Sequence, residues 1–254
     1  MVESKYQVVG VAGGLGRGLM HRTKNEVPKC LLQVEGKPLL EYSLKLYAED
    51  GFDDFILLLG HLYEKVIDYI EKSKFRKMVK YSVEKELLGK GGAIKNALDN
   101  GTIDRCRPCF LFYPDDLILQ KGFPRHLASY HERKREEGAL ATMVSVPGTY
   151  YRYGVPVYDE KSFVKSFVEK PWVEIPANVA VYVLDPEVYK IIDECVDLSK
   201  KPVDFEKAVL PKLCEMRALA NFSLDYEAWV PFNDEKDYEV GVERVKKWKL
   251  LGNF

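Results

Sequence analysis

Apolar runs alternate with amphipathic segments over the first 146 residues of the chain. The runs have the length and apolar content of strands, and they lie at 6–11, 55–59, 77–84, 109–113 and 140–146. The segments between them repeat apolar residues every three or four positions, which is the period of a helix. These predicted helices are 38–50, 64–71, 91–99 and 123–137. The alternation predicts an α/β fold of the Rossmann-like kind, a mostly parallel mixed sheet flanked by helices.

The second half of the chain has shorter elements at less regular spacing. Its predicted strands are 153–157, 162–168, 178–184, 219–224 and 227–232, and its predicted helices are 186–192, 204–214 and 234–250. No repeat and no low-complexity linker separates the halves, so residues 1–254 are expected to form a single domain. We expect 147–254 to cover the rim of the sheet. Because the last predicted element is a helix, capped by Asn233 or Asp234, no C-terminal β-helix domain is expected.

Five glycines between positions 10 and 18 directly follow the first predicted strand. Glycine adopts positive φ and leaves its backbone N–H open to a ligand, so this loop is typical of a phosphate cradle. A second polar step, Pro114-Asp115-Asp116, directly follows a buried strand. Ligands of such sheets bind beyond the carboxyl ends of the strands, which predicts that both segments lie on one rim.

The composition narrows the class of protein. Hydrophobic residues make up 46% and charged residues 30% of the chain, which excludes disorder, and the net charge of −1 gives no general basic field for nucleic acid or an anionic membrane. No apolar run approaches the ~20 residues of a membrane span, and the N-terminus is unlike a signal peptide, so a cytoplasmic location is expected. The five cysteines are scattered, and the CxxC pair Cys106 and Cys109 has no second pair, so neither disulfides nor a zinc site is expected.

Several short motifs stand along the chain in a fixed order. They are Ala-Gly-Gly-x-Gly at 12–16, Pro-Lys-x-Leu at 28–31, Gly-Lys-Pro-Leu-Leu at 36–40, Leu-Gly at 88–89, Pro-Asp at 114–115, Tyr-Gly-Val at 153–155, Glu-Lys-Pro at 169–171 and Asn-x-Ala-x-Tyr at 178–182. In this order they resemble the motifs of the sugar-phosphate nucleotidyltransferases, the nucleoside-diphosphate-sugar pyrophosphorylases. The resemblance covers nearly the whole chain.

The resemblance implies a reaction in which a nucleotidyl group passes from an NTP to a sugar 1-phosphate, giving an NDP-sugar and pyrophosphate, with Mg²⁺ as the cofactor. It implies a nucleotide-binding half at 1–146 and a sugar-binding half at 147–254. The expected partners are the NTP and the sugar 1-phosphate, with no nucleic acid and no membrane, and a homo-oligomer stays open.

The resemblance also implies three groups of site residues. Catalysis would depend on Lys29 and Arg17 beside the phosphates and on Asp115 as the Mg²⁺ ligand. The nucleotide would contact Ala12, Gly13, Gly14, Gly16, Glu84 and Gly89. The sugar phosphate would contact Tyr153, Gly154, Glu169, Lys170 and Asn178. Without a ligand the same residues have plainer explanations, as a solvated lysine, a turn cap, a surface ion pair or a strand edge.

Two positions depart from the family pattern. Gly18 stands where the family has an arginine, so Arg17 would have to reach the phosphates from the neighbouring position, with Arg22 as a second candidate. Pro231 stands where the family has an aspartate that shares the metal, and proline has no side-chain ligand. The residues that could replace it after a loop rearrangement are Asn233, Asp234 and Asp225.

Glu84 stands where uridylyl- and thymidylyl-transferring relatives often have glutamine. A carboxylate can accept hydrogen bonds from the ring N–H and the amino group of guanine together, so Glu84 favours a guanine nucleotide over the alternative of an exposed strand residue. Two other functions stay open. One is a catalytically weak relative that binds a nucleotide sugar or sugar phosphate and regulates a partner protein. The other is a nucleotidyltransferase that acts on a non-sugar phosphate, such as a phospho-polyol or phosphocholine.

Overall fold

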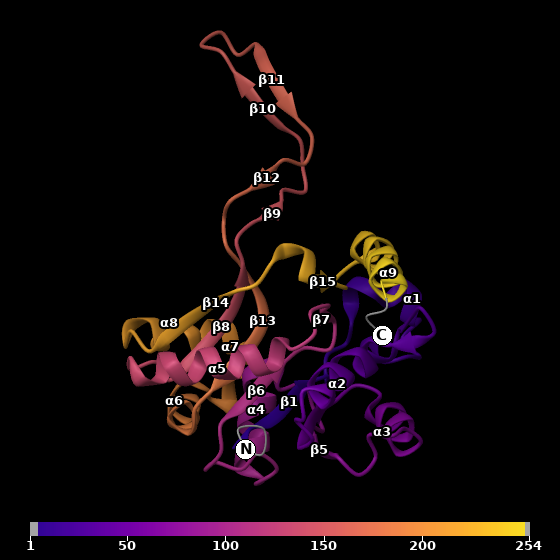
Figure 1. The fold of residues 1–254 in the computed structure, drawn as a ribbon, viewed down its shortest axis with the longest axis vertical. Helices are drawn as coiled ribbons and strands as arrows, with labels where there is room; N and C mark the ends of the chain where they lie inside the picture. The colour runs from indigo at the N-terminus through magenta and orange to yellow at the C-terminus, as the bar shows by residue number, and fades with distance from the viewer. Residues whose placement is uncertain (1–4, 252–254) are drawn as a thin grey trace.

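The computed structural model describes residues 5–251, which form a body built on one large sheet and an arm that projects from it (Figure 1). The sheet has seven strands in the order β14-β8-β13-β6-β1-β4-β5. Their bounds are Gln7–Val11 (β1), Phe55–Leu59 (β4), Val79–Val83 (β5), Cys109–Phe112 (β6), Ala141–Val146 (β8), Ala177–Leu184 (β13) and Leu219–Ser223 (β14). Only β13 runs antiparallel to its neighbours in this sheet, so the predicted mostly parallel mixed sheet is confirmed.

Helices cover both faces of the sheet. The main ones are Leu39–Glu49 (α2), Tyr63–Glu71 (α3), Gly89–Asp99 (α4), Phe123–Glu136 (α5) and Pro186–Cys195 (α6). A further long helix, Glu235–Leu250 (α9), packs in a separate apolar cluster. The predicted single helix 204–214 is wrong in one respect, because it is divided into Phe205–Ala208 (α7) and Leu210–Glu215 (α8). Pro211 causes the division, since it has no N–H to donate and disfavours helical backbone before it. Asp234 caps α9 by accepting from the Asp237 N–H, as predicted.

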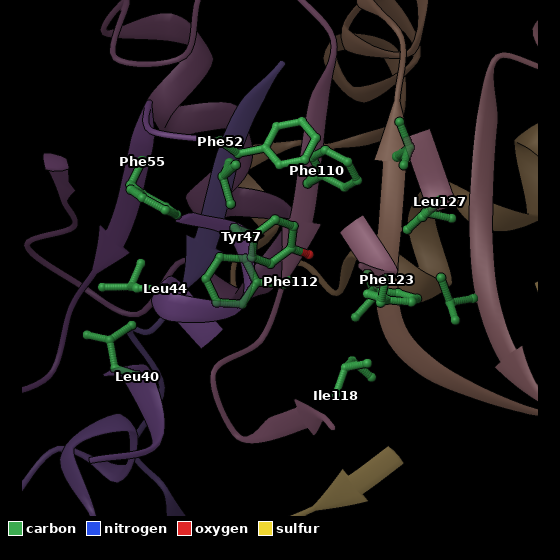
Figure 2. Packing of buried hydrophobic residues seen from close by; sticks show 14 of the residues in the cluster. Leu40, Leu44, Tyr47, Phe52, Phe55, Phe110, Phe112, Ile118, Phe123 and Leu127 are labelled. Carbon is green, nitrogen blue, oxygen red and sulfur yellow. The ribbon is translucent and has the colours of Figure 1, made fainter. Parts of the chain in front are cut away.

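The alternation of side chains along the buried strands produces two apolar layers. On one face Phe110 and Phe112 of β6 pack with Tyr47 of α2, with ring centroids 5.2 and 5.3 Å from that of Tyr47 (Figure 2). On the other face Leu111 packs with residues of α4 and α6, among them Ile94 and Ile192. Truncating a buried phenylalanine of this kind to alanine costs about 3–5 kcal/mol. The two layers therefore hold the sheet rigidly, together with the loops at its carboxyl edge.

A third, smaller apolar cluster lies beside this edge. It joins Leu19 of the glycine loop's short 3₁₀ helix Arg17–Leu19 (η2) to Phe232 and to Val245 of α9. The strand Trp229–Pro231 (β15) pairs antiparallel with Asp116–Ile118 (β7), which directly follows the Pro114-Asp115 step. The chain just before α9 therefore lies against the rim, as we expected for part of the second half.

The arm is the part of the second half that does not cover the rim. It comprises two short hairpin ladders, Thr149–Tyr150 (β9) with Trp172–Val173 (β12) and Val155–Tyr158 (β10) with Val164–Val168 (β11). Figure 1 shows β10 and β11 well beyond the rest of the chain. Every residue of β11 is exposed. Among residues 5–251 no helix is long and apolar enough to cross a membrane.

Candidate active site

A cavity of about 260 Å³ opens at the carboxyl ends of β1 and β6. We call it the rim cavity, and its lining comprises Val11, Ala12, Gly14, Gly16, Lys29, Cys30, Lys90, Tyr113, Pro114, Asp115, Asp116 and Asn233. The glycine loop and the Pro114-Asp115-Asp116 step therefore share one wall, which is the arrangement that their positions after two parallel strands predict.

Lys29 and Asp115 form an ion pair in the rim cavity. The distance from Lys29 Nζ to Asp115 Oδ2 is 2.5 Å, and their side chains are only 15% and 27% exposed. Lys29 begins the short 3₁₀ helix Lys29–Leu31 (η3) and lies against Gly16, where a Cβ would come within 3.0 Å of Lys29 Cβ. Gly16 has φ +61°, so a side chain at this position would be strained as well as crowded. The glycine loop thus fixes where the Lys29 ammonium group lies.

Asp116 is the second carboxylate of the rim cavity. Its Oδ1 accepts a hydrogen bond from Trp229 Nε1 of β15 at 2.8 Å. Burial and the neighbouring charge of Asp115 raise the pKa of Asp116 to about 7. Two adjacent carboxylates in a partly buried place repel one another, and added positive charge there would relieve the repulsion.

Lys90 is a second cation in the rim cavity, and the sequence reasoning missed it. Its Nζ lies 2.8 Å from Glu206 Oε1 and 4.3 Å from the centre of the Tyr113 ring. The resemblance implies threonine at this position, so it gives a lysine there no role. The signal in the sequence was a lysine inside the glycine-rich entry to a helix, where anions are favoured.

A chain of polar side chains leads from Lys90 towards Asn178. Asn178 Nδ2 donates to Tyr182 Oη at 2.6 Å, and that hydroxyl lies 3.5 Å from Glu206 Oε1. Within residues 5–251, Glu206 Oε2 and Tyr113 Oη are buried without a hydrogen-bond partner. Asn178 is not part of the rim cavity's lining, but it connects to the cavity through this polar chain.

Asn178 also holds an irregular turn of β13. Its Oδ1 accepts the Ala180 N–H at 3.0 Å, and Ala180 has φ +58° within an interruption of the β13–β8 ladder. The family motif has glycine at this position, and alanine in this backbone region costs about 1 kcal/mol or more. The conformation expected of the family's glycine is therefore kept here despite the substitution.

A second hollow of about 360 Å³ lies beside the glycine loop, and we call it the outer hollow. It is lined by Gly13, Leu15, Gly60, His61, Leu62, Tyr63, Glu64, Glu84, Lys85, Glu86 and Leu87. Glu84 is only half-buried by exposure, yet its Oε2 accepts the Leu88 N–H at 3.3 Å and burial raises its pKa to about 7. A Cβ on Gly13 would lie 3.0 Å from Glu84 Oε1, so two predicted nucleotide-binding residues meet here.

Gly89 has a different neighbour from the one that we expected. It has φ +76°, and a Cβ there would come within 2.5 Å of the Val203 carbonyl oxygen. The Val203 N–H in turn donates to the Leu88 carbonyl oxygen at 2.8 Å. The close approach that requires glycine is therefore made by the backbone of Val203. Its predicted contact with a nucleoside stays a prediction.

The two candidate arginines differ sharply. Arg17 is exposed, and its side chain makes no hydrogen bond, ion pair or ring contact to any other residue within 5–251. Arg22 donates to both carboxylate oxygens of Glu235 and stacks over the Tyr238 ring at 4.0 Å. Arg17 can therefore swing towards the rim cavity, whereas Arg22 is held against α9.

The two positions that depart from the family pattern meet at one short segment, 231–234. Gly18 packs against this segment, and Pro231 is its first residue. A Cβ on Gly18 would come within 2.0 Å of the Asn233 carbonyl oxygen, so no side chain fits there without moving the segment. Pro231 pairs with Asp116 in the β7–β15 ladder. Of the proposed replacements for the lost aspartate, Asn233 lines the rim cavity, whereas Asp234 caps α9 and Asp225 caps the 3₁₀ helix Tyr226–Ala228 (η5).

The carboxylates of the rim cavity decide whether Mg²⁺ could bind there. Within residues 5–251 no group of three or more histidine, cysteine, aspartate and glutamate side chains could hold a metal ion. Mg²⁺ commonly uses one or two carboxylates and completes its shell with water and phosphate oxygens. Asp115 and Asp116 supply two adjacent carboxylates whose mutual repulsion a cation would relieve, so the residues fit a Mg²⁺ site of this kind.

The arm carries the remaining four predicted sugar-site residues, and none of them lines the rim cavity. They are Tyr153, Gly154, Glu169 and Lys170. Two of them meet, because a Cβ on Gly154 would lie 2.7 Å from Glu169 Oε2. Lys170 has φ +46°, a strained backbone for a residue that precedes proline. The structure therefore divides the predicted sugar site into an arm cluster and the body residue Asn178.

Comparison with known proteins identifies the family. Residues 8–248 match the family described as nucleotidyl transferase, so the chain belongs to it. The chain is 30% identical over 238 residues to the mannose-1-phosphate guanyltransferase of Kluyveromyces lactis, an alignment that covers 91% of the chain and 62% of the relative. The chain thus spans about three fifths of that relative's length.

Solved structures agree with this assignment. HddC from Yersinia pseudotuberculosis is 26% identical with a TM-score of 0.66, and the match covers 94% of this chain and 99% of HddC. A UDP-glucose pyrophosphorylase complexed with UDP-glucose is 18% identical with a TM-score of 0.70, over 95% and 98% of the two chains. At that identity it shows the fold alone. The predicted resemblance to the sugar-phosphate nucleotidyltransferases is confirmed.

Proposed function

We propose that this member of the nucleotidyl transferase family transfers a guanylyl group from GTP to a sugar 1-phosphate, giving a GDP-sugar and pyrophosphate. The observation that carries the proposal is the convergence of the glycine loop, Lys29 and Asp115 on the rim cavity. The K. lactis relative is named for mannose 1-phosphate and a guanyl group, which supports the same reaction class here.

The chemistry explains why these residue types gather. A phosphate oxygen of the sugar 1-phosphate attacks the α-phosphorus of GTP, a new P–O bond forms, and the bond to the departing pyrophosphate breaks. Two anions must approach each other, so the main task of the protein is to offset negative charge. Lys29 and Lys90 bring positive charge into the rim cavity, and the glycine loop leaves backbone exposed beside them. The attacking oxygen is already ionised, so the step requires no general base.

Asp115 and Asp116 would hold Mg²⁺. When bound, Mg²⁺ supplies positive charge to the phosphates and holds their oxygens in place. The Lys29 ammonium group already lies 2.5 Å from Asp115. This contact keeps one acidic side chain neutralised when the phosphates are absent.

The choice of guanine rests on Glu84 in the outer hollow. When ionised, its carboxylate can accept from the ring N–H and the exocyclic amino group of guanine together. Adenine has no ring N–H at the corresponding place, and uracil offers only a single donor. The half-buried position of Glu84 beside Gly13 strengthens such hydrogen bonds, because competing water is partly excluded.

A second function is favoured by two observations. Arg17 lies in solvent and Pro231 replaces an acidic residue, so a catalytically weak relative that binds a nucleotide sugar and regulates a partner protein fits the same cavities. A cytoplasmic location, where GTP and sugar phosphates are available, suits either function.

The deciding experiment measures pyrophosphate release with Mg²⁺ over a grid of NTPs and phosphorylated acceptors. We expect release with GTP and a hexose 1-phosphate, and none from Asp115→Asn at the same protein concentration. Release only with phosphocholine or a phospho-polyol would replace the sugar as the acceptor. No release from any pair, with retained binding of a GDP-sugar in calorimetry, would favour the regulatory function.

A further inference from the structure

The arm concentrates the exposed apolar side chains of the molecule. Within residues 5–251, 19 large hydrophobic side chains are exposed, and 12 of them lie between 150 and 175. These are Tyr150, Tyr151, Tyr153, Val155, Val157, Tyr158, Phe163, Val164, Phe167, Val168, Trp172 and Ile175. An exposed apolar concentration of this kind marks an interaction surface.

The hairpin β10–β11 has no further strand partner among residues 5–251. Its two strands pair only with each other, so each leaves one edge unpaired. An isolated two-stranded hairpin is at best marginally stable in water, and it requires packing against another surface. The arm therefore requires another protein surface to pack against.

The base of the arm holds it away from its own rim cavity. Arg152 pairs with Asp234 at 2.6 Å and with Asp237 at 3.3 Å, both at the start of α9. Trp172 packs edge-on against Tyr226, with ring centroids 5.1 Å apart. Folding the arm back over the body that carries it would break these contacts.

The size of the exposed surface suits a second copy of the chain. Seven aromatic side chains of the arm are between 37% and 70% exposed. At ~200 Å² for each aromatic side chain, together they leave roughly 800 Å² in water, which is the size of one side of a standard protein interface. The seven other exposed large hydrophobic side chains of residues 5–251 are spread over the body, so the arm is the apolar concentration that a second copy would cover.

We propose that two copies of this chain exchange their arms, so that each arm docks on the body of the other copy and brings Glu169 and Lys170 to that copy's rim cavity. The role of these two residues rests on the proposed function, whereas the association does not. A two-fold axis makes both contacts equivalent, and it leaves no arm uncovered. Each sugar site is then built from two chains.

Light scattering tests the association without any substrate. We expect a mass of twice 29.2 kDa for the wild type at micromolar concentration. The variant Tyr158→Ser/Phe163→Ser, at the end of the arm, should dissociate at a concentration at least tenfold higher than the wild type. The matched control Met216→Ser/Val240→Ser removes exposed apolar side chains from the body and should stay dimeric. A monomeric wild type, or an arm variant as dimeric as the control, would overturn the proposal.

Isotope-mixed cross-linking tests the exchange itself, again without activity. Equal amounts of ¹⁴N and ¹⁵N chains are mixed and treated with a lysine-reactive cross-linker. We expect cross-links from Lys170 to Lys29 or Lys90 to join light and heavy chains in about half of the cases, as random pairing of two copies requires. Cross-links confined to single-isotope chains would mean that each arm folds onto its own body.

Mixing two impaired variants tests whether the shared site carries out the reaction. At a sugar 1-phosphate concentration well below KM, Lys29→Ala and Lys170→Ala would each keep at most about a tenth of the wild-type activity. A mixture should recover about a quarter of it, since half of the dimers are mixed and each carries one intact site. No recovery from an active wild type would overturn the shared site. A wild type that dimerises through its arms and shows no activity would contradict the proposed function while leaving the association in place.

Discussion

The rim cavity and the arm differ in which side chains they expose to water. Around the rim cavity the charged side chains are paired: Lys29 with Asp115, both partly buried, and the more exposed Lys90 with the partly buried Glu206. On the arm, apolar side chains of both β10 and β11 are exposed to solvent. The difference teaches that the site that we propose for the nucleotide is preformed in a single chain, whereas the site that we propose for the sugar depends on what covers the arm.

The two regions are nevertheless physically connected. Trp172 at the base of the arm packs on Tyr226, whose ring centroid lies 6.3 Å from that of Trp229. Trp229 in turn donates to Asp116 in the rim cavity. Movement of the arm would therefore reach one of the two carboxylates that we assign to Mg²⁺. The predictions below separate what the body does alone from what requires the arm.

The largest effect is expected in the body. Lys29→Ala removes a cation from the phosphates and leaves Asp115 without its 2.5 Å partner. We expect kcat to fall by about 100- to 1000-fold, the usual cost of losing one preorganised charge at a reacting centre. Steady-state pyrophosphate release measures this. Lys72→Ala is the matched control, because that lysine is exposed and its ion-pair partner within residues 5–251 is the surface residue Asp68. Equal losses from both variants would contradict the assignment of Lys29.

The next effect concerns the free energy of unfolding, which depends on the packing of Gly18 against the segment at Asn233. Gly18→Ala would place a Cβ within 2.0 Å of the Asn233 carbonyl oxygen, so the segment must move. We expect the free energy of unfolding to fall by about 1–3 kcal/mol, as for other overpacked positions. In Gly14→Ala the new Cβ meets nothing within 4 Å, and urea unfolding should show a change below about 0.5 kcal/mol. Indistinguishable midpoints for the two variants would refute the close packing.

The raised pKa of Glu84 predicts that the affinity for GTP depends on pH. This effect should not require the arm, because Glu84 lies in the body. Burial raises its pKa to about 7, so the side chain is mostly neutral at pH 6 and mostly ionised at pH 8. Only the ionised form accepts from both guanine donors, so the affinity for a GTP analogue should rise about tenfold between these pH values. Glu84→Gln should abolish the rise and reduce the preference for GTP over UTP.

Glu86→Gln is the matched control for this titration, because Glu86 lines the same outer hollow but is exposed. Calorimetry with a non-hydrolysable GTP analogue measures the affinities. An unchanged pH dependence in Glu84→Gln, or a wild type that prefers UTP, would remove Glu84 from base recognition.

The smallest effect distinguishes the two arginines. Arg17 is free to swing towards the phosphates, so Arg17→Ala should lower kcat by about tenfold through the loss of one charged hydrogen-bond donor. Arg22 is held by Glu235 and Tyr238, so Arg22→Ala should change kcat by less than about twofold. Similar small changes in both would show that no arginine replaces the one that the family has at Gly18.

The sequence predicted the body well because its signals are local. Buried strands such as Phe55–Leu59 and the amphipathic helices between them carry their own periodicity, and parallel strands place their carboxyl ends on one edge. That edge brought Lys29, Asp115 and the glycine loop together as expected. Glu84, predicted for the nucleotide, does meet Gly13 in the outer hollow.

The rest depended on contacts between distant segments. Lys90 gains its place from Glu206, 116 positions away, and no local pattern predicts that pair. The motif order could not say that Tyr153 and Glu169 lie on a projecting arm, because short strands with a turn between them read the same in either arrangement. The contact of Gly18 with the Asn233 carbonyl likewise depends on how α9 packs on the body.

Two-substrate kinetics of Glu169→Gln/Lys170→Ala tests the division between body and arm most directly. Both substitutions lie on the arm, away from the lining of the rim cavity. Our account predicts that KM for the sugar 1-phosphate rises at least about tenfold, because a charged contact to the sugar phosphate is lost, while KM for GTP stays within about twofold. An equal rise in both KM values, or no change in either, would contradict it.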